Sequence, residues 1–220
     1  MPACIHCQTD SQFLTYDALG LCHHCAPQHA PIIAGAIQGI SEAAASRTKA
    51  RRAADQLEAL RESLGHCDVL QAYAGLRFEG VDPAKLRSEL EQMRTDTVEQ
   101  AIRDHWFEAR ERARDAASPK GMAVSYGKAI SRLQDLAEHV DDAAVIEKAV
   151  IVLRAERDGL VFEDLVRQAQ LAEQQGRKSR ARDLYIEAVF ALRKDGTPDA
   201  FQTDKIELAE KQIERLGGRP

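Results

Sequence analysis

Four of the five cysteines in this 220-residue chain form two closely spaced pairs near the N-terminus. Cys4 and Cys7 make the first Cys-x-x-Cys pair, Cys22 and Cys25 make the second, and fourteen residues separate the pairs. A tetrahedral Zn²⁺ ion accepts four cysteine thiolates, and the two-residue gap lets both sulfurs of a pair turn toward one ion. The spacing therefore predicts one structural Zn²⁺ ion bound by these four cysteines.

Other uses of these cysteines fit the pattern less well. Two disulfides require an oxidising compartment, and a redox Cys-x-x-Cys normally opens a helix after a strand. A catalytic zinc keeps an open coordination position, which four thiolates close. A histidine in place of one cysteine is the alternative ligand, and four lie in this segment: His6, His23, His24 and His29. The fifth cysteine, Cys67, is expected to be a small buried apolar residue of a helix.

The gap between the two pairs is long enough for a short β-hairpin that returns the second pair to the first. Phe13–Tyr16 is the expected arm and Asp17–Gly20 the expected turn, with Gly20 free to take a positive φ. A proline is tolerated in the first turn of a helix, as at Pro27, but Pro31 should break a helix that begins at Cys22. We expect a short turn after Cys25 and a new helix from about Pro31.

The segment from Cys4 to Cys25 resembles the zinc-ribbon and treble-clef fingers. The run Gly20-Leu21-Cys22-His23-His24-Cys25 is similar to the second knuckle of a treble clef, whose last two ligands lie at the start of a helix. The resemblance covers about a tenth of the chain. It implies a metal site and does not imply a function.

Composition favours a mainly α fold. Charged residues make up 30% and aromatic residues 5% of the chain, with 30 Lys+Arg against 35 Asp+Glu and a net charge of −5. Residues 1–46 contain neither lysine nor arginine, so we do not expect the finger to grip a nucleic-acid backbone. No apolar run reaches the ~20 residues of a membrane span. With no signal-peptide pattern at the start, we expect a cytoplasmic protein.

Apolar residues at steps of three and four predict helices through the rest of the chain. One long helix is expected over 31–64, ended by Gly65 and followed by a shorter piece from Asp68 to about Leu76. A second is expected over 83–117, with Asp82 as N-cap and Pro83 in the first turn. We expect the two long helices to form a hairpin, and a coiled-coil homodimer is the alternative.

Shorter helices are expected after Ser118, separated by tight turns. Their ranges are 119–139, 142–157, 160–175, 177–194 and 199–216, and breaks are expected at Asp158-Gly159 and Gly176, with Thr197 or Asp199 capping the last helix. The pair 160–194 resembles a tetratricopeptide repeat (TPR), in which small and aromatic residues let two helices pack closely. The positions that carry the resemblance are Leu165, Ala169, Ala181, Tyr185 and Ala188. A plain antiparallel bundle is the alternative.

The expected fold is therefore a small Cys4 zinc finger with a short β-hairpin, then long helices and a TPR-like antiparallel helical stack. The expected domains are 1–30, 31–117 and 118–220. Two clusters of four cations lie in the helical part, the first at Arg47, Lys49, Arg51 and Arg52, and the second at Arg177, Lys178, Arg180 and Arg182. Because cations are unfavourable at a helix N-terminus, the second cluster predicts compensation by Glu173 or by an anionic group of a partner.

The sequence contains no glycine-rich phosphate loop, nucleophile elbow or Ser/His/Asp grouping. We therefore predict a non-enzymatic adaptor or scaffold that binds protein partners through the finger and the helical stack. Two alternatives remain open: a nucleic-acid-associated regulator that uses cluster 47–52, and a structural subunit of a larger assembly.

Overall fold

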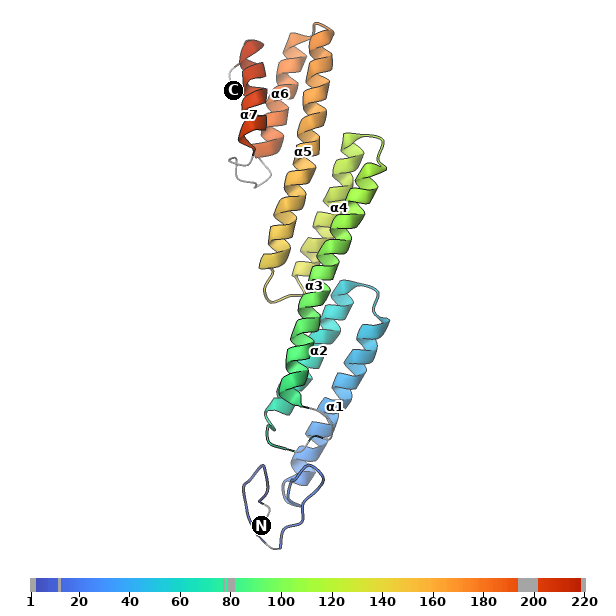
Figure 1. Cartoon of the computed structure of the whole chain (residues 1–220), viewed down its shortest axis with the longest axis vertical. Helices are drawn as coiled ribbons and strands as arrows, with labels where there is room; N and C mark the ends of the chain where they lie inside the picture. The colour runs from blue at the N-terminus through green and yellow to red at the C-terminus, as the bar shows by residue number, and fades with distance from the viewer. Residues whose placement is uncertain (1–2, 12, 77, 79–81, 194–201, 219–220) are drawn as a thin grey trace. The chain divides into compact units, whose positions relative to one another are not determined.

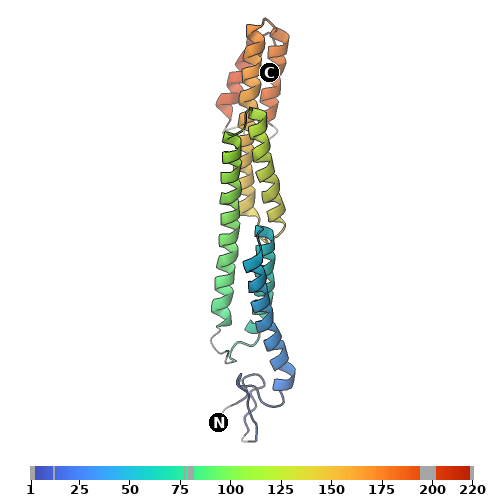
Figure 2. The same cartoon turned by 90° about the vertical axis from the view of Figure 1, so that its right-hand side faces the viewer.

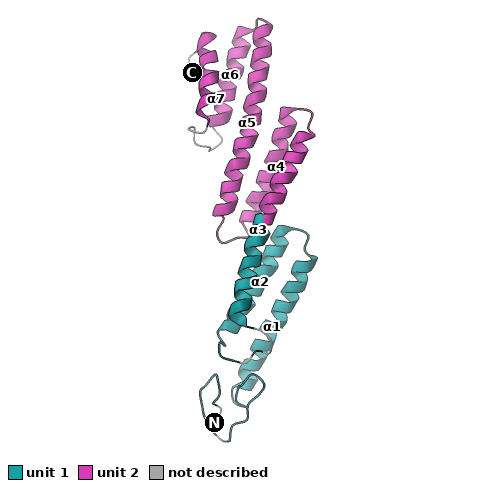
Figure 3. Cartoon of the chain, viewed as in Figure 1, with its two compact units in different colours: residues 1–99 teal, residues 100–220 magenta. Residues whose placement is uncertain are grey.

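The computed structural model describes residues 3–11, 13–76, 78, 82–193 and 202–218. Over these residues the chain forms seven α-helices and no β-strand, which confirms a mainly α fold. The chain divides into two compact units, residues 1–99 and 100–220, and the boundary lies within helix α3 (Figure 3). Within the described part of the chain, none of the helices combines the length and apolarity needed to traverse a lipid bilayer.

The first unit is built on a hairpin of two helices. Helices α1 (Ala26–Lys49) and α2 (Ala53–Gln71) pack side by side in both views (Figures 1 and 2). The chain reverses between them through residues 50–52, where Ala50 and Arg52 are extended with ψ of 128° and 139°. The prediction of one helix over 31–64 is therefore wrong, and Gly65 lies inside α2 instead of ending a helix.

Helix α3 (Pro83–Arg114) starts as predicted. Asp82 Oδ1 accepts hydrogen bonds from the backbone N–H groups of Ala84 and Lys85, at 2.9 and 3.3 Å, which is N-cap geometry. Its first turns pack on α2, where one core cluster contains Leu60, Leu64, Cys67 and Leu90, with Ile40 and Leu86 at its edge. The hairpin of this unit is thus α1 against α2 with α3 beside it, and not the predicted pairing of 31–64 with 83–117.

The second unit is a sequence of packed helices. Helices α4 (Pro119–Ala137), α5 (Ala144–Gln174), α6 (Lys178–Arg193) and α7 (Thr203–Arg215) each pack on the next along the chain. Ser118 caps α4, because its side-chain oxygen accepts the N–H of Gly121 at 3.2 Å. Figures 1 and 2 show α4 beside the first half of α5, and α6 and α7 beside its second half.

Helix α5 runs without interruption through Asp158 and Gly159, so the predicted break there is wrong. Both residues are buried, and the Asp158 carboxylate accepts two hydrogen bonds from the Arg157 guanidinium, at 2.7 and 2.9 Å. A paired carboxylate can be buried within a helix, and packing then outweighs the poor helix propensity of Asp-Gly.

The predicted turn at Gly176 is confirmed. Gly176 has a φ of 72°, and the N–H of Arg177 donates to the carbonyl of Ala172 at 2.9 Å, as in a glycine C-cap. The five positions that carry the resemblance to a TPR lie in or against one core cluster formed by α5, α6 and α7: Leu165, Ala169, Ala181, Tyr185 and Ala188. The predicted caps Thr197 and Asp199 lie outside the described residues.

Candidate metal centre

The first cysteine pair is held in a tight turn. The N–H of Gln8 donates to the carbonyl of Cys4 at 2.8 Å, and the N–H of Cys4 donates to the carbonyl of Thr9 at 3.1 Å. Gln8 takes a φ of 55°, a left-handed conformation that non-glycine residues seldom adopt. This turn folds the chain back immediately after Cys7, with Cys4 buried and Cys7 exposed.

The second pair leads directly into α1. The N–H groups of Cys25 and Ala26 both donate to the carbonyl of Cys22 at 2.9 Å, and Cys25 is the N-cap of α1. The prediction of a separate helix from Pro31 is therefore wrong: α1 begins at Ala26, with Pro27 in its first turn and Pro31 inside it. A proline in the first turn costs nothing, because that N–H has no partner in the helix.

The predicted β-hairpin between the two pairs is not found among the described residues. Pairing is limited there to two isolated antiparallel bridges, Ala3 with Asp10 and Tyr16 with Cys22. The predicted turn is present, because the N–H of Gly20 donates to the carbonyl of Asp17 at 3.0 Å and Gly20 has a φ of 83°. Backbone hydrogen bonds and the cysteines therefore fix this segment without a sheet.

The four predicted cysteines come together. The Sγ atoms of Cys4, Cys7, Cys22 and Cys25 all lie within 4.8 Å of one another, and those of Cys7 and Cys22 are 3.9 Å apart. With Zn–S bonds of about 2.3 Å, a tetrahedral zinc site has sulfurs roughly 3.8 Å apart. The donor set and its spacing thus fit one Zn²⁺ ion. No histidine belongs to this group within the described residues: the His6 ring packs at a tilt against His29, and His23 does so against His24.

The surroundings of these thiols shift their pKa values in opposite directions. Burial raises the pKa of Cys4, but hydrogen bonds from the backbone of Cys7, Cys22 and His6 outweigh it and lower that pKa to about 6. Burial and the neighbouring sulfurs raise the pKa of Cys25 to about 12. Four thiolates at this spacing repel one another, so full deprotonation requires a cation among them. A divalent metal ion is the group that meets this requirement.

The finger is packed against the end of the α1–α2 hairpin. Leu21 is fully buried, and it shares a core cluster with Ile33 of α1, Leu70 of α2 and Leu76. Ile5, from the first pair, packs at the edge of the same cluster. The finger therefore provides the apolar cover for this end of the hairpin.

Cys67, the remaining cysteine, is buried in α2 as predicted. Its Sγ lies 3.6 Å from the carbonyl oxygen of Pro83, and burial raises the pKa of its thiol. It shares its core cluster with Leu60, Leu64 and Leu90 and is not among the four clustered sulfurs. Its role is packing.

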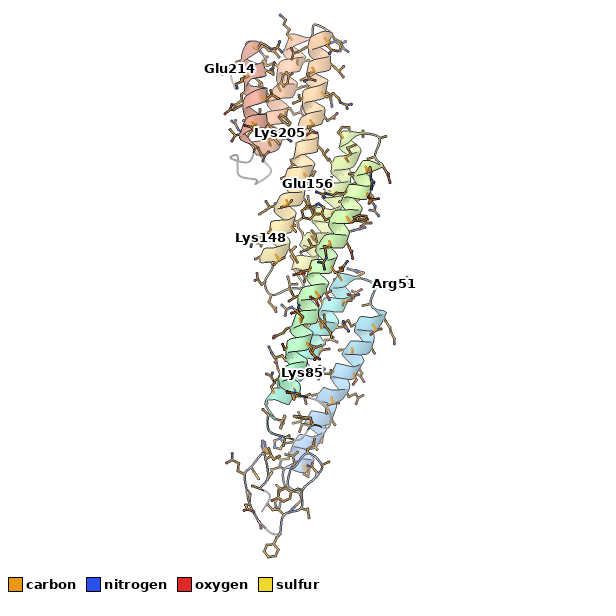
Figure 4. All side chains as sticks on the ribbon, viewed as in Figure 1. Arg51, Lys85, Lys148, Glu156, Lys205 and Glu214 are labelled. Atoms are coloured by element: carbon orange, nitrogen blue, oxygen red, sulfur yellow. The ribbon has the colours of Figure 1, made fainter. Side chains whose placement is uncertain are left out.

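The first basic cluster lies where the α1–α2 hairpin turns. Arg47 and Lys49 are in the last turn of α1, and Arg51 and Arg52 follow in the connection, where Figure 4 labels Arg51. Cations near a helix C-terminus are stabilised by the helix dipole. This placement gives Arg47 and Lys49 a local structural reason, whereas Arg51 and Arg52 lie at the start of α2, where the helix dipole does not favour cations.

The second basic cluster has no such reason. Arg177, Lys178 and Arg180 are exposed at the start of α6, and Arg182 lies 3.7 Å from the Asp183 carboxylate. Glu173, the predicted compensating acid, is engaged elsewhere. It accepts a hydrogen bond from the Tyr185 hydroxyl at 3.0 Å and forms an ion pair with Arg215 of α7.

The Glu173–Arg215 pair lies in a groove that sequence reasoning missed. The groove has a volume of about 310 Å³, and α5, α6 and α7 line it with, among others, Gln170, Glu173, Tyr185, Leu208, Gln212 and Arg215. Glu173 and Arg215 are 42 residues apart, so no local pattern signals that they meet. Amides, a hydroxyl and an ion pair together offer hydrogen-bond donors and acceptors to a polar ligand.

No family model, curated protein or solved structure matches this chain. The interpretation of the site therefore depends on the chemistry of its own residues.

Proposed function

We propose that this chain is a non-enzymatic adaptor whose N-terminal finger is folded around one structural Zn²⁺ ion. The observation that carries the proposal is the cluster of four sulfurs within 4.8 Å. Four thiolates fill the coordination shell of zinc, so the ion stabilises the fold and has no position left for a substrate. Cys4, Cys7, Cys22 and Cys25 are the proposed ligands.

The adaptor role is supported by two surfaces in the second unit. One is the polar groove of α5, α6 and α7, whose amide and charged side chains offer hydrogen-bond donors and acceptors to part of a polypeptide. The other is the exposed basic start of α6, which suits an acidic segment of a protein partner. The proposed partner-binding residues there remain Arg177, Lys178, Arg180 and Arg182, on a helical stack that we propose is TPR-like.

Native mass spectrometry tests the metal. The purified chain should carry one Zn²⁺ ion, and Cys22→Ser should lose it, whereas Cys67→Ser should keep it because Cys67 is outside the cluster. A strong chelator should also make residues 1–76 sensitive to protease. A chain without metal, or one in which Cys67→Ser loses the metal, contradicts the proposal.

Charge reversal tests the adaptor surface. Arg180→Glu combined with Arg182→Glu should abolish capture of a partner by the full chain, with Lys120→Glu on α4 as a control that keeps it. Unchanged capture by the double variant removes this surface from the proposal. A turnover assay that finds a substrate removes the non-enzymatic role.

A second candidate function is regulation through nucleic acid, favoured by the four cations at 47–52. Binding by that cluster would weaken steeply as salt rises, because each phosphate contact releases counterions. A flat salt dependence of binding to duplex DNA excludes it. A third candidate, a structural subunit that forms a homodimer through its long helices, predicts a dimer mass in light scattering.

A further inference from the structure

The four cysteines of the candidate metal centre differ in their access to solvent. Cys4 and Cys22 are buried, Cys25 is half-buried, and Cys7 is exposed. The Cys4 sulfur is protected further, because it accepts a hydrogen bond from the backbone N–H of Cys22 at 3.3 Å. An oxidant in solution should therefore reach the Cys7 sulfur before the other three.

The exposed sulfur has a second cysteine within reach. Cys7 Sγ lies 3.9 Å from Cys22 Sγ, and the two residues belong to different Cys-x-x-Cys pairs. A disulfide has an S–S bond of about 2.05 Å, so the two sulfurs need to approach by about 2 Å. Redox-sensing cysteines are typically accessible and lie beside a second cysteine that reacts with the oxidised one. Cys7 and Cys22 meet both conditions.

A bond between Cys7 and Cys22 is incompatible with the closed metal site. Four thiolates fill the coordination shell of zinc, and a disulfide would remove two of them. Cys22 also follows Leu21, which is fully buried in the core cluster that contains Ile33 of α1 and Leu70 of α2. Movement of Cys22 toward Cys7 should therefore withdraw Leu21 from the end of the α1–α2 hairpin.

We infer that Cys7 is the modification site of a redox switch, at which a peroxide oxidises the finger, a Cys7–Cys22 disulfide forms and the bound zinc is released. The end of the hairpin, with Ile33 and Leu70, then becomes accessible as apolar surface. The inference rests on the proposed zinc-bound finger and adds its regulation.

Two reactions form the disulfide. The Cys7 thiolate attacks one oxygen of hydrogen peroxide, so that an S–O bond forms, the O–O bond breaks, and the departing hydroxide takes a proton to become water. Cys7 is then a sulfenic acid, oxidised by two electrons while the peroxide is reduced by two. The Cys22 thiolate attacks the Cys7 sulfur, the S–S bond forms, the S–O bond breaks, and the second hydroxide leaves as water after protonation. One peroxide molecule is consumed for each disulfide.

The fifth cysteine should not compete with Cys7. Cys67 is buried in α2 and is not among the four clustered sulfurs. Cys67→Ser should therefore leave the rate of zinc release unchanged.

The first test follows zinc release from the full zinc-loaded chain, with hydrogen peroxide and a chromogenic chelator. Cys7→His removes the exposed sulfur but keeps four ligands, because a histidine nitrogen is an ordinary zinc ligand. This variant should release zinc about tenfold more slowly or less, as expected when the accessible sulfur is absent. Cys25→His is the matched control, because it also leaves three cysteines and one histidine but retains Cys7 and Cys22. It should release zinc about as fast as the unaltered chain.

The second test maps the disulfide in the unaltered chain and depends on no variant. Samples are quenched in acid early in the reaction, free thiols are alkylated, and the peptides are identified by mass spectrometry. Cys7 and Cys22 should be joined, and the other three cysteines should be alkylated. Fluorescence of a dye that binds apolar surface should rise as zinc is released, and dithiothreitol with added zinc should reverse the rise.

Three results would overturn the inference: zinc retained by the unaltered chain in excess peroxide, release from Cys7→His at the rate of the unaltered chain, or a first disulfide that lacks Cys7 or Cys22. Each of these, in a chain that carries one Zn²⁺ ion before peroxide is added, leaves the proposed function intact. A chain that carries no ion before peroxide is added contradicts the proposed function itself.

Discussion

His29 Nδ1 lies 3.1 Å from the hydroxyl oxygen of Tyr73, and this hydrogen bond joins the first turn of α1 to the residues that follow α2. The His6 ring, from between the first two cysteines, packs at a tilt against His29 with the ring centroids 3.9 Å apart. The finger, the first turn of α1 and the residues that follow α2 therefore meet at these three side chains. Folding of the finger and closure of the hairpin should be coupled.

Tyr73→Phe tests this link. The substitution keeps the ring and removes the hydroxyl group, so it should lower the free energy of unfolding by about 1 kcal/mol, the usual net value of one hydrogen bond. The zinc content should not change, because Tyr73 is not a ligand. Urea unfolding followed by circular dichroism measures the effect. A stability equal to that of the unaltered chain would mean that this bond contributes nothing in solution.

Gly20→Ala should disturb the finger itself. Gly20 has a φ of 83°, and a Cβ there would lie 2.7 Å from Ile5 Cδ1. The left-handed conformation alone costs an alanine about 1–2 kcal/mol, and the contact adds to it. We expect weaker zinc binding in a competition titration with a chromogenic chelator.

Gly35→Ala is the control for that substitution. Gly35 is exposed inside α1, and a Cβ there would meet no atom within 4 Å. It should leave zinc affinity unchanged and stabilise the helix by up to about 1 kcal/mol. Equal zinc affinity for both alanine variants would contradict the role assigned to Gly20.

The contact between the two hairpin helices is tested at Gly39. A Cβ on Gly39 would lie 2.2 Å from Nε2 of His66, so Gly39→Ala forces the imidazole ring away. Overpacking of this kind typically costs about 1–3 kcal/mol. Gly65→Ala, in open space on the same hairpin, should instead stabilise the chain by up to about 1 kcal/mol.

A double substitution identifies the cause of the loss at Gly39. If the clash with the imidazole is responsible, Gly39→Ala should cost much less in a His66→Ala background. Thermal unfolding of the unaltered chain, the two single variants and the double variant gives the coupling energy between Gly39→Ala and His66→Ala. Additive effects of the two substitutions would show that the loss has another origin.

Local signals predicted much of this structure. The Cys-x-x-Cys spacing identified the four sulfurs that meet, and Asp82, Ser118 and Gly176 mark helix ends where capping chemistry required them. These features depend on residues close in the sequence. Their geometry is therefore fixed by the local chain.

Features set by tertiary packing were not predictable in this way. The chain reverses between α1 and α2 at residues 50–52 without a glycine or proline, whereas Gly65 and Gly159 lie inside helices although glycine often ends them. In each case burial of an apolar face outweighs local propensity. The groove around Glu173 and Arg215 joins residues of two distant helices, and no periodicity indicates such a pair.

The pH dependence of the unfolding free energy should reveal the titration of Tyr185 in the groove. Tyr185 is buried, and burial together with its hydrogen bond to Glu173 raises the pKa of its hydroxyl from 10.0 to about 12. Above pH 10 the unfolded chain releases this proton while the folded chain retains it. The contribution of Tyr185 is therefore complete below pH 10, and stability should fall as the pH rises from about 10 to about 12.

Tyr185→Phe removes this titration and keeps the ring. Unfolding free energies measured from pH 8 to pH 12 should show the unaltered chain losing its advantage over the variant only above about pH 10. Glu173→Gln supplies a matched control, because the amide oxygen still accepts the hydroxyl proton but the negative charge that helps raise the pKa of Tyr185 is gone. In Glu173→Gln the fall in unfolding free energy should therefore end at a lower pH than in the unaltered chain. The difference in unfolding free energy between the unaltered chain and Tyr185→Phe could instead stay constant from pH 8 to pH 12. Tyr185 would then titrate alike in the folded and unfolded chains, and Glu173 would not hold the proton of the Tyr185 hydroxyl.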